Sequence, residues 1–197
     1  TADAYLSGAV RTKLEVAEAA AALDTVFVRN VEALREVQPV DLKPSDITAR
    51  LGAPWIPAAD IVAFVVEAMN TSIVIHHTPE LASWTVEARQ LESLAAGTSE
   101  WGTHRRHAGL LLSDALNSSI PQIFDTVRDG VTERRILNSE ATEAAKEKLA
   151  KIKAAFQAWI WTDPDRTDRL TRIYNDRFNN LVPRHFDGNH LQLPGAS

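Results

Sequence analysis

The sequence contains no cysteine and only one methionine among its 197 residues. Without cysteine there is no disulfide framework, no thiolate nucleophile and no zinc or iron–sulfur site with cysteine ligands. The longest apolar stretches are interrupted within about ten residues, well short of the ~20 that a membrane-spanning helix needs. From these absences we expect a cytoplasmic protein that folds without covalent staples.

Phosphate-binding and nucleophile motifs are also missing. The chain has no G-x-x-x-x-G-K-[ST] loop, no G-x-G-x-x-G turn and no G-x-S-x-G elbow. We therefore expect no catalytic residue, no metal ion and no cofactor in this segment.

The composition itself is that of an ordinary globular protein, with 45% hydrophobic and 24% charged residues. The net charge of −5 argues against a protein that binds nucleic acid over its whole surface. Acidic residues predominate in residues 1–100, whereas residues 101–197 are slightly basic. Any contact with phosphate is therefore expected in the second half.

The spacing of apolar residues predicts a mainly α-helical α+β fold, built from helical hairpins with one or two small antiparallel β-hairpins. The β-hairpins are expected at residues 72–77 with 84–88, and at 122–127 with 132–137, the latter turning at Asp129-Gly130. The helices are expected at residues 5–23, after an N-cap at Asp24, at 45–51, from Pro57, at 103–117, at 139–161 and after Asp163.

We expect a single compact domain over residues 1–197. Within it, residues 1–70 form a helical part, 71–137 a mixed part, 138–183 a helical pair and 184–197 an extended tail. Because the chain starts at Thr1 and its only methionine is Met69, we also expect it to be a fragment of a longer protein.

Four arginines are the candidate nucleic-acid contacts. Guanidinium groups bind phosphate with two parallel hydrogen bonds, so a cluster of them could hold a DNA backbone. Solvated surface charge is the simpler interpretation of the same residues. The candidates are Arg105, Arg106, Arg134 and Arg135.

Histidines suggest an alternative, a small metal-dependent enzyme. His104 and His107 would share one face of the expected helix, with Asp114 as a third ligand. His76 and His77 alternate along a strand and cannot both face one site. Capping or solvated histidines are the simpler interpretation.

Residues 45–69 also have the outline of a helix-turn-helix. A recognition helix should offer basic or amide side chains near its start, but this one offers Ala58, Ala59 and Asp60. We interpret the motif as structural. Tryptophans can stack on bases, but Trp159 lies in an apolar stripe and is expected in the core, while Trp55 and Trp161 could form an exposed apolar contact.

A series of short phrases, in this order, resembles one known family. They are Tyr5–Gly8, Val10–Leu14, Asn30–Leu34, Gln38-Pro39, Arg50–Pro57, Trp101–Thr103, Ala115–Asn117, Ala144–Lys148, Phe156–Ile160, Tyr174–Asn179, Asp187–Leu191 and Pro194-Gly195. Together they resemble the region between the methylase-like and Swi/Snf-type helicase parts of large phage and conjugative-plasmid DNA methylase/helicase proteins, which are related to defence-against-restriction proteins.

The resemblance implies a methyltransferase before Thr1 and an ATPase after Ser197, so no catalytic residue of the family is carried over to this segment. It implies a non-catalytic coupling domain, with the neighbouring methylase and helicase domains of the same chain as partners and DNA as a further contact. Two alternatives stay open, a protein-interaction domain that ignores DNA and the metal-dependent enzyme.

Overall fold

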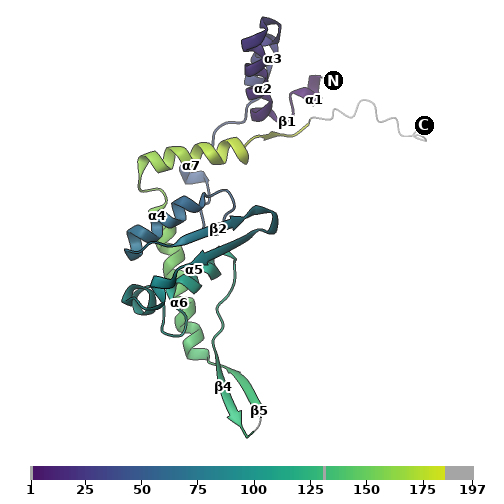
Figure 1. The fold of residues 1–197 in the computed structure, drawn as a ribbon. Coiled ribbons are helices and arrows are strands. Elements are labelled where there is room, and N and C mark those ends of the chain that lie inside the picture. The colour runs from purple at the N-terminus through teal and green to yellow at the C-terminus, as the bar shows by residue number, and fades with distance from the viewer. Residues whose placement is uncertain (1, 131, 185–197) are drawn as a thin grey trace, which may run out of the picture. The chain divides into compact units, whose positions relative to one another are not determined.

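The fold is mainly helical, as the computed structural model in Figure 1 shows. The structure describes residues 2–130 and 132–184. It is 56% helical and contains three small two-stranded antiparallel sheets, which confirms the predicted α+β class. The chain divides into two compact units, Thr1–Ile47 with Thr171–Ser197, and Thr48–Leu170. A single domain therefore stays a prediction, and each unit is described by itself.

A helical hairpin forms most of the first unit. Helices α2 (Val10–Leu23) and α3 (Val28–Glu36) are joined by the short 3₁₀ turn η1 (Thr25–Phe27). Asp24 caps this turn by accepting a hydrogen bond from the backbone N–H of Val26 at 2.9 Å. The buried contacts between the helices come from Val10, Ala17, Val31 and Leu34. The expected pair of antiparallel helices is confirmed.

The beginning of this unit differs from the single helix expected at residues 5–23. Gly8 has φ +74°, a left-handed conformation that interrupts a helix. Lys13 stabilises the break, since its ammonium donates to three backbone carbonyls, that of Ser7 at 2.7 Å. The observed elements are α1 (Ala2–Tyr5) and β1 (Gly8–Ala9), which pairs with β6 (Leu181–Val182).

Helix α7 (Pro164–Arg177) begins after Asp163, as predicted, and the division between the units falls inside it. The carboxylate of Asp163 accepts a hydrogen bond from the backbone N–H of Arg166 at 2.7 Å. Leu170 is buried, whereas Phe178 and Leu181, which follow the helix, are 50% and 68% exposed.

The core of the second unit lies around α6 (Ser139–Trp159), with α4 (Ala58–Met69) and α5 (Ala108–Leu116). The predicted stripe on α6 is confirmed, because Leu149, Ile152 and Phe156 are buried and Trp159 is half-buried. Phe64 meets Phe156 edge to face, with ring centroids 5.3 Å apart. Helix α6 ends two residues before the predicted Trp161.

The helix expected at residues 45–51 is wrong. Only the 3₁₀ turn η2 (Pro44–Asp46) is helical there. Beyond it, Ala49 and Leu51 are buried while Arg50 between them is exposed, and this period of two is that of extended chain. The outline of a helix-turn-helix is therefore absent.

The helix expected at residues 103–117 begins only at Ala108. Thr103 and Arg106 exchange backbone hydrogen bonds of 2.9 and 3.2 Å, which closes a tight turn before the helix. His107 follows in an extended conformation as the N-cap. The short helical turns before it, η4 (Arg89–Glu92) and η5 (Ala96–Glu100), were not predicted.

Both expected β-hairpins are confirmed. Strands β2 (Val74–Thr78) and β3 (Ser83–Glu87) are connected through η3 (Pro79–Leu81). Strands β4 (Phe124–Asp129) and β5 (Thr132–Leu137) pair in the register Asp129↔Thr132 to Phe124↔Leu137. None of the described helices combines the length and the apolar character needed to cross a membrane. Except for Arg184, the predicted extended tail (residues 184–197) lies outside the described residues.

Candidate functional site

The β4–β5 hairpin is the most exposed regular element of the second unit. It extends beyond the helices of that unit (Figure 1), and we call it the β4–β5 arm (Phe124–Asp129 and Thr132–Leu137). Every residue of β5 is exposed, and β4 is half-buried only at Phe124 and Asp125. Both faces of the outer part of the arm therefore meet solvent.

Alternation along the strands places the arm's side chains on two faces. The register puts Phe124, Arg135 and Leu137 on one face, where the guanidinium of Arg135 lies 4.5 Å above the ring of Phe124. Arg134 and Ile136 lie on the opposite face. The two adjacent arginines thus point in opposite directions.

The other two candidate arginines are occupied by carboxylates. Arg106 donates two hydrogen bonds of 2.6 Å to the buried carboxylate of Asp114 on α5. Arg105 donates to Asp125 at 2.8 Å and to the carbonyl of Phe124 at 3.0 Å. Hydrogen bonds from Arg105 and from Asn138 hold the pKa of the Asp125 carboxyl below its usual value.

The structure therefore does not assemble the four predicted arginines into one basic patch. Arg106 anchors α5, and Arg105 ties the base of the arm to the loop before α5. Arg134 and Arg135 remain without a carboxylate partner among the described residues. Of the predicted phosphate contacts, these two are the ones whose charge is not paired with a carboxylate in the described chain.

The candidate metal ligands do not converge. His104 is exposed, His107 occupies the N-cap position of α5 without a side-chain capping hydrogen bond, and the carboxylate of Asp114 is bound by Arg106. Burial, assisted by the charge of Arg106 and opposed by Glu92, lowers the pKa of His107. In residues 2–130 and 132–184, no group of three histidine or carboxylate side chains is placed to hold a metal ion.

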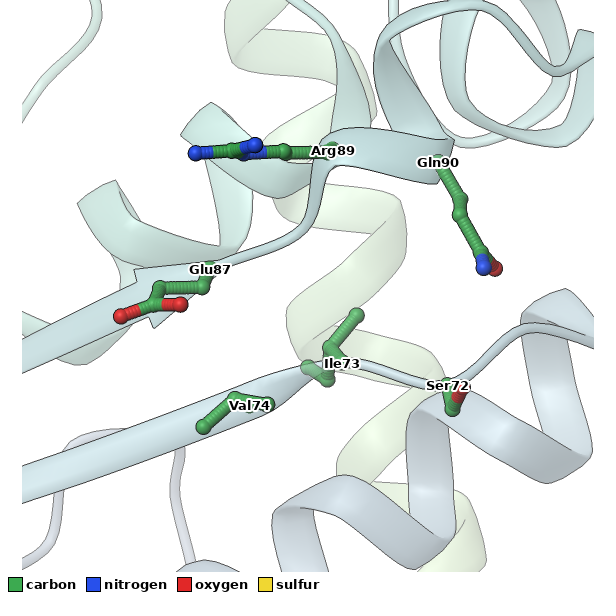
Figure 2. Close-up of a pocket in the computed structure, with 6 residues that line it drawn as sticks. All are labelled: Ser72, Ile73, Val74, Glu87, Arg89 and Gln90. Atoms are coloured by element: carbon green, nitrogen blue, oxygen red, sulfur yellow. The ribbon is translucent and has the colours of Figure 1, made fainter.

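A shallow hollow of about 270 Å³ lies where β2 and β3 separate (Figure 2). Arg89 and Glu87 extend to one side of it, while Gln90 extends toward Ser72 on the other. Thr71, next to the hollow, donates to the Gln90 side chain at 2.5 Å. Because its charged groups point away from its centre, the hollow does not provide the convergent groups of an active site.

Residues 50–180 match the model of a protein family described as a domain of unknown function (DUF8437). The chain belongs to this family. No curated protein and no solved structure matches it. The DUF8437 region contains nearly all of the second unit, including the β4–β5 arm.

Tryptophans expected at the surface of this DUF8437 protein are largely covered. Trp55 is only 6% exposed, which contradicts its predicted role as an exposed apolar contact, and Trp161 is half-buried. On the arm, Val127, Ile136 and Leu137 are exposed, as are apolar side chains elsewhere in the same unit, such as Leu81 and Ile120. The exposure of β5 has a signal in the sequence. Charged residues in Thr132–Leu137 fall on both alternating faces of the strand, so neither face can be buried.

Proposed function

We propose that this chain is a non-catalytic docking module that connects parts of a larger cytoplasmic DNA-processing protein, and that the β4–β5 arm is its contact. The observation that carries the proposal is the exposure of both faces of the arm. A two-stranded hairpin alone is marginally stable in water, so a hairpin exposed in this way gains stability when a partner covers it.

The chemistry of the arm favours a protein partner over DNA. Val127, Ile136 and Leu137 are 46%, 51% and 46% exposed and offer apolar surface. The arm also carries Asp125, Asp129 and Glu133, which phosphates would repel. The resemblance to methylase/helicase proteins supports neighbouring domains of the same protein as the partners.

Removal of the outer arm tests this function. Residues 126–135 are replaced by an Asn-Gly turn that joins Asp125 directly to Ile136. Asp125 and Ile136 are register partners, and their side chains lie on the same face of the arm as those of Asp129 and Thr132 beside the native turn. A two-residue turn therefore fits between them as it does there. The bond between Arg105 and Asp125 is retained, so we expect α5 and α6 to fold as before.

The 197-residue chain and its shortened form are then mixed with the polypeptide segments encoded on either side of it, and complexes are measured by analytical size exclusion. We expect the complete chain, but not the shortened form, to bind one of these segments. Equal binding by both forms, with both folded by circular dichroism, would contradict the proposal. Anisotropy with a DNA duplex at two salt concentrations distinguishes DNA contact, since binding to phosphate weakens steeply with salt.

A further inference from the structure

We infer that the outer edge of β5 receives an extended acidic strand from the partner, which adds to the β4–β5 arm as a third strand. The inference rests on the docking function proposed above and specifies its chemistry. The partner segment carries two adjacent acidic residues next to two adjacent apolar residues.

The backbone of β5 provides the first part of the argument. The sheet that contains β5 has two strands, so β5 pairs on one side only. In such a ribbon, alternate N–H and C=O groups of each strand point outward and are available to another strand. Every residue of β5 is exposed, so no described element covers this edge.

Charge distinguishes the β5 edge from the β4 edge. On β4, Asp125 is bound by Arg105, and Arg128 is bound by Glu133 of β5 at 2.6 Å. Asp129 is then the one charge of β4 without an ion-pair partner in the described chain. On β5, Arg134 and Arg135 are both without a carboxylate. An acidic strand is therefore attracted to β5 and repelled by the end of β4.

The order of side chains on β5 specifies the partner's pattern. Arg134 and Ile136 lie on one face, and Arg135 and Leu137 on the other. A strand beside β5 places successive side chains on the same two alternating faces. Two adjacent acids then lie next to the two arginines, one on each face, and two adjacent apolar residues lie next to Ile136 and Leu137.

Stacking on Phe124 leaves Arg135 able to bind such a carboxylate. The central carbon of its guanidinium lies over the ring, 4.5 Å from the centroid. The N–H donors lie along the edge of the guanidinium plane and remain free for two parallel hydrogen bonds. Stacking also restricts the side chain, so less conformational entropy is lost when the carboxylate binds.

A second copy of the chain and a DNA duplex fit this edge less well. Pairing two β5 edges would bring two arginines from each copy onto one short interface, where like charges repel. In DNA, a ribbon that enters the major groove reads bases with one face. Arg134 and Arg135 lie on opposite faces, so only one of them would contact the bases.

Labelled peptides of about eight residues, the length of an ordinary strand, test the inference by fluorescence anisotropy. The first peptide has two adjacent glutamates and two adjacent valines between threonines, and is made in both orders, since an added strand pairs either parallel or antiparallel with β5. In the second peptide, lysines replace the glutamates, and the third probe is a short DNA duplex. We expect the complete chain to bind the glutamate peptide about tenfold more tightly than the lysine peptide.

Charge reversal then tests whether the two arginines are responsible. In the variant Arg134→Glu with Arg135→Glu, we expect the preference to invert in favour of the lysine peptide. The matched control is Arg50→Glu with Arg89→Glu, which changes the net charge equally at exposed positions of the same unit and should keep the original preference. Amide exchange should show new protection on β5 and none on β4.

Three results overturn the inference: equal binding of both peptides, an unchanged preference after charge reversal, or tighter binding of the duplex. They are distinct from a failure of the docking function itself. If shortening the arm abolishes binding of the flanking segment but charge reversal does not, the arm docks by another chemistry. If shortening has no effect, the docking function fails as well.

Discussion

The body of the second unit and its β4–β5 arm use the same residue types in opposite ways. In the body, Arg106 is held by two hydrogen bonds to a carboxylate that is 6% exposed. On the arm, Arg134 has no carboxylate partner in the described chain and lies in solvent. Arg106 therefore stabilises the fold through an ion pair, whereas Arg134 makes no such contribution.

Apolar residues follow the same division. Phe156 is fully buried against Phe64, whereas Ile136 on the arm is 51% exposed. Apolar side chains grouped on one exposed element are candidates for a binding surface. Structural constraint therefore lies in the body, whereas interaction is the role that we propose for the arm, and each prediction below pairs a change in one with a change in the other.

The largest effect is expected from Phe156→Ala. Its ring is fully buried, so its loss removes apolar burial and leaves a cavity that costs about 3–5 kcal/mol of unfolding free energy. The matched change Ile136→Ala should cost less than about 0.5 kcal/mol, since the side chain is half in solvent already. Urea unfolding followed by circular dichroism measures both. Similar costs for the two variants would show that the arm belongs to the core.

The second comparison is between two arginine environments. Asp114→Ala leaves the partly buried guanidinium of Arg106 without its carboxylate, and we expect a loss of about 2–3 kcal/mol. Arg134→Ala should change stability by less than about 0.5 kcal/mol. Urea unfolding measures the free energy of unfolding of both variants. A strongly destabilised Arg134→Ala would mean that this side chain has a structural role.

Two glycines with positive φ provide the third comparison. At Gly52 (φ +86°), an added Cβ would lie 2.3 Å from the carbonyl oxygen of Leu116, so Gly52→Ala should cost more than about 2 kcal/mol from strain and clash together. At Gly130 (φ +62°) nothing lies within 4 Å, so Gly130→Ala should cost about 1 kcal/mol from conformation alone. Hydrogen exchange should place the first loss throughout the body and the second within the arm.

The body was largely predictable from the sequence, because a period of 3.6 identifies a helix with one buried face. Helix α6 was found with its buried stripe. In the arm, the alternation and the turn signal identified β5 with its observed bounds, Thr132–Leu137. The helix at residues 45–51 was predicted wrongly because Ala49 and Leu51 alternate with exposed residues, and a short stretch of this kind suits either period.

The candidate site was predictable only as a set of arginines. Sequence alone does not show which arginine finds a carboxylate, since Arg106 and Asp114 meet only when the turn at Thr103 delays the start of α5. Adjacent Arg134 and Arg135 looked like one patch, but the pleat of a strand turns them to opposite faces. Tertiary contacts, rather than local pattern, decide which charges remain free.

The smallest change in stability is expected from pH, and it should differ between the body and the arm. Burial holds the pKa of His107 below its usual 6.5, so the folded body binds fewer protons than the unfolded chain as pH falls through that value. Stability should therefore decrease from pH 6.5 down to the lowered pKa and change no further from this group below it. Solvent screens a half-buried ring, so the loss should stay below about 1 kcal/mol.

Urea midpoints at pH 7.5 and 5.5 measure this loss, and His107→Gln should reduce it because glutamine does not titrate. The matched control is His104→Gln, an exposed side chain in the same turn, which should keep the pH dependence of the parent chain.

The corresponding group of the arm is Asp125. Its lowered pKa contributes stability above pH 3.8, the usual value for a carboxyl of this kind, and this stability is lost only as the pH falls below that value. The pH ranges over which His107 and Asp125 change protonation do not overlap. Acidification from pH 7.5 to 5.5 should therefore weaken the body while leaving the bond between Arg105 and Asp125 intact. If His107→Gln leaves the pH dependence unchanged, the histidine at the start of α5 is not the group that couples the body to protons.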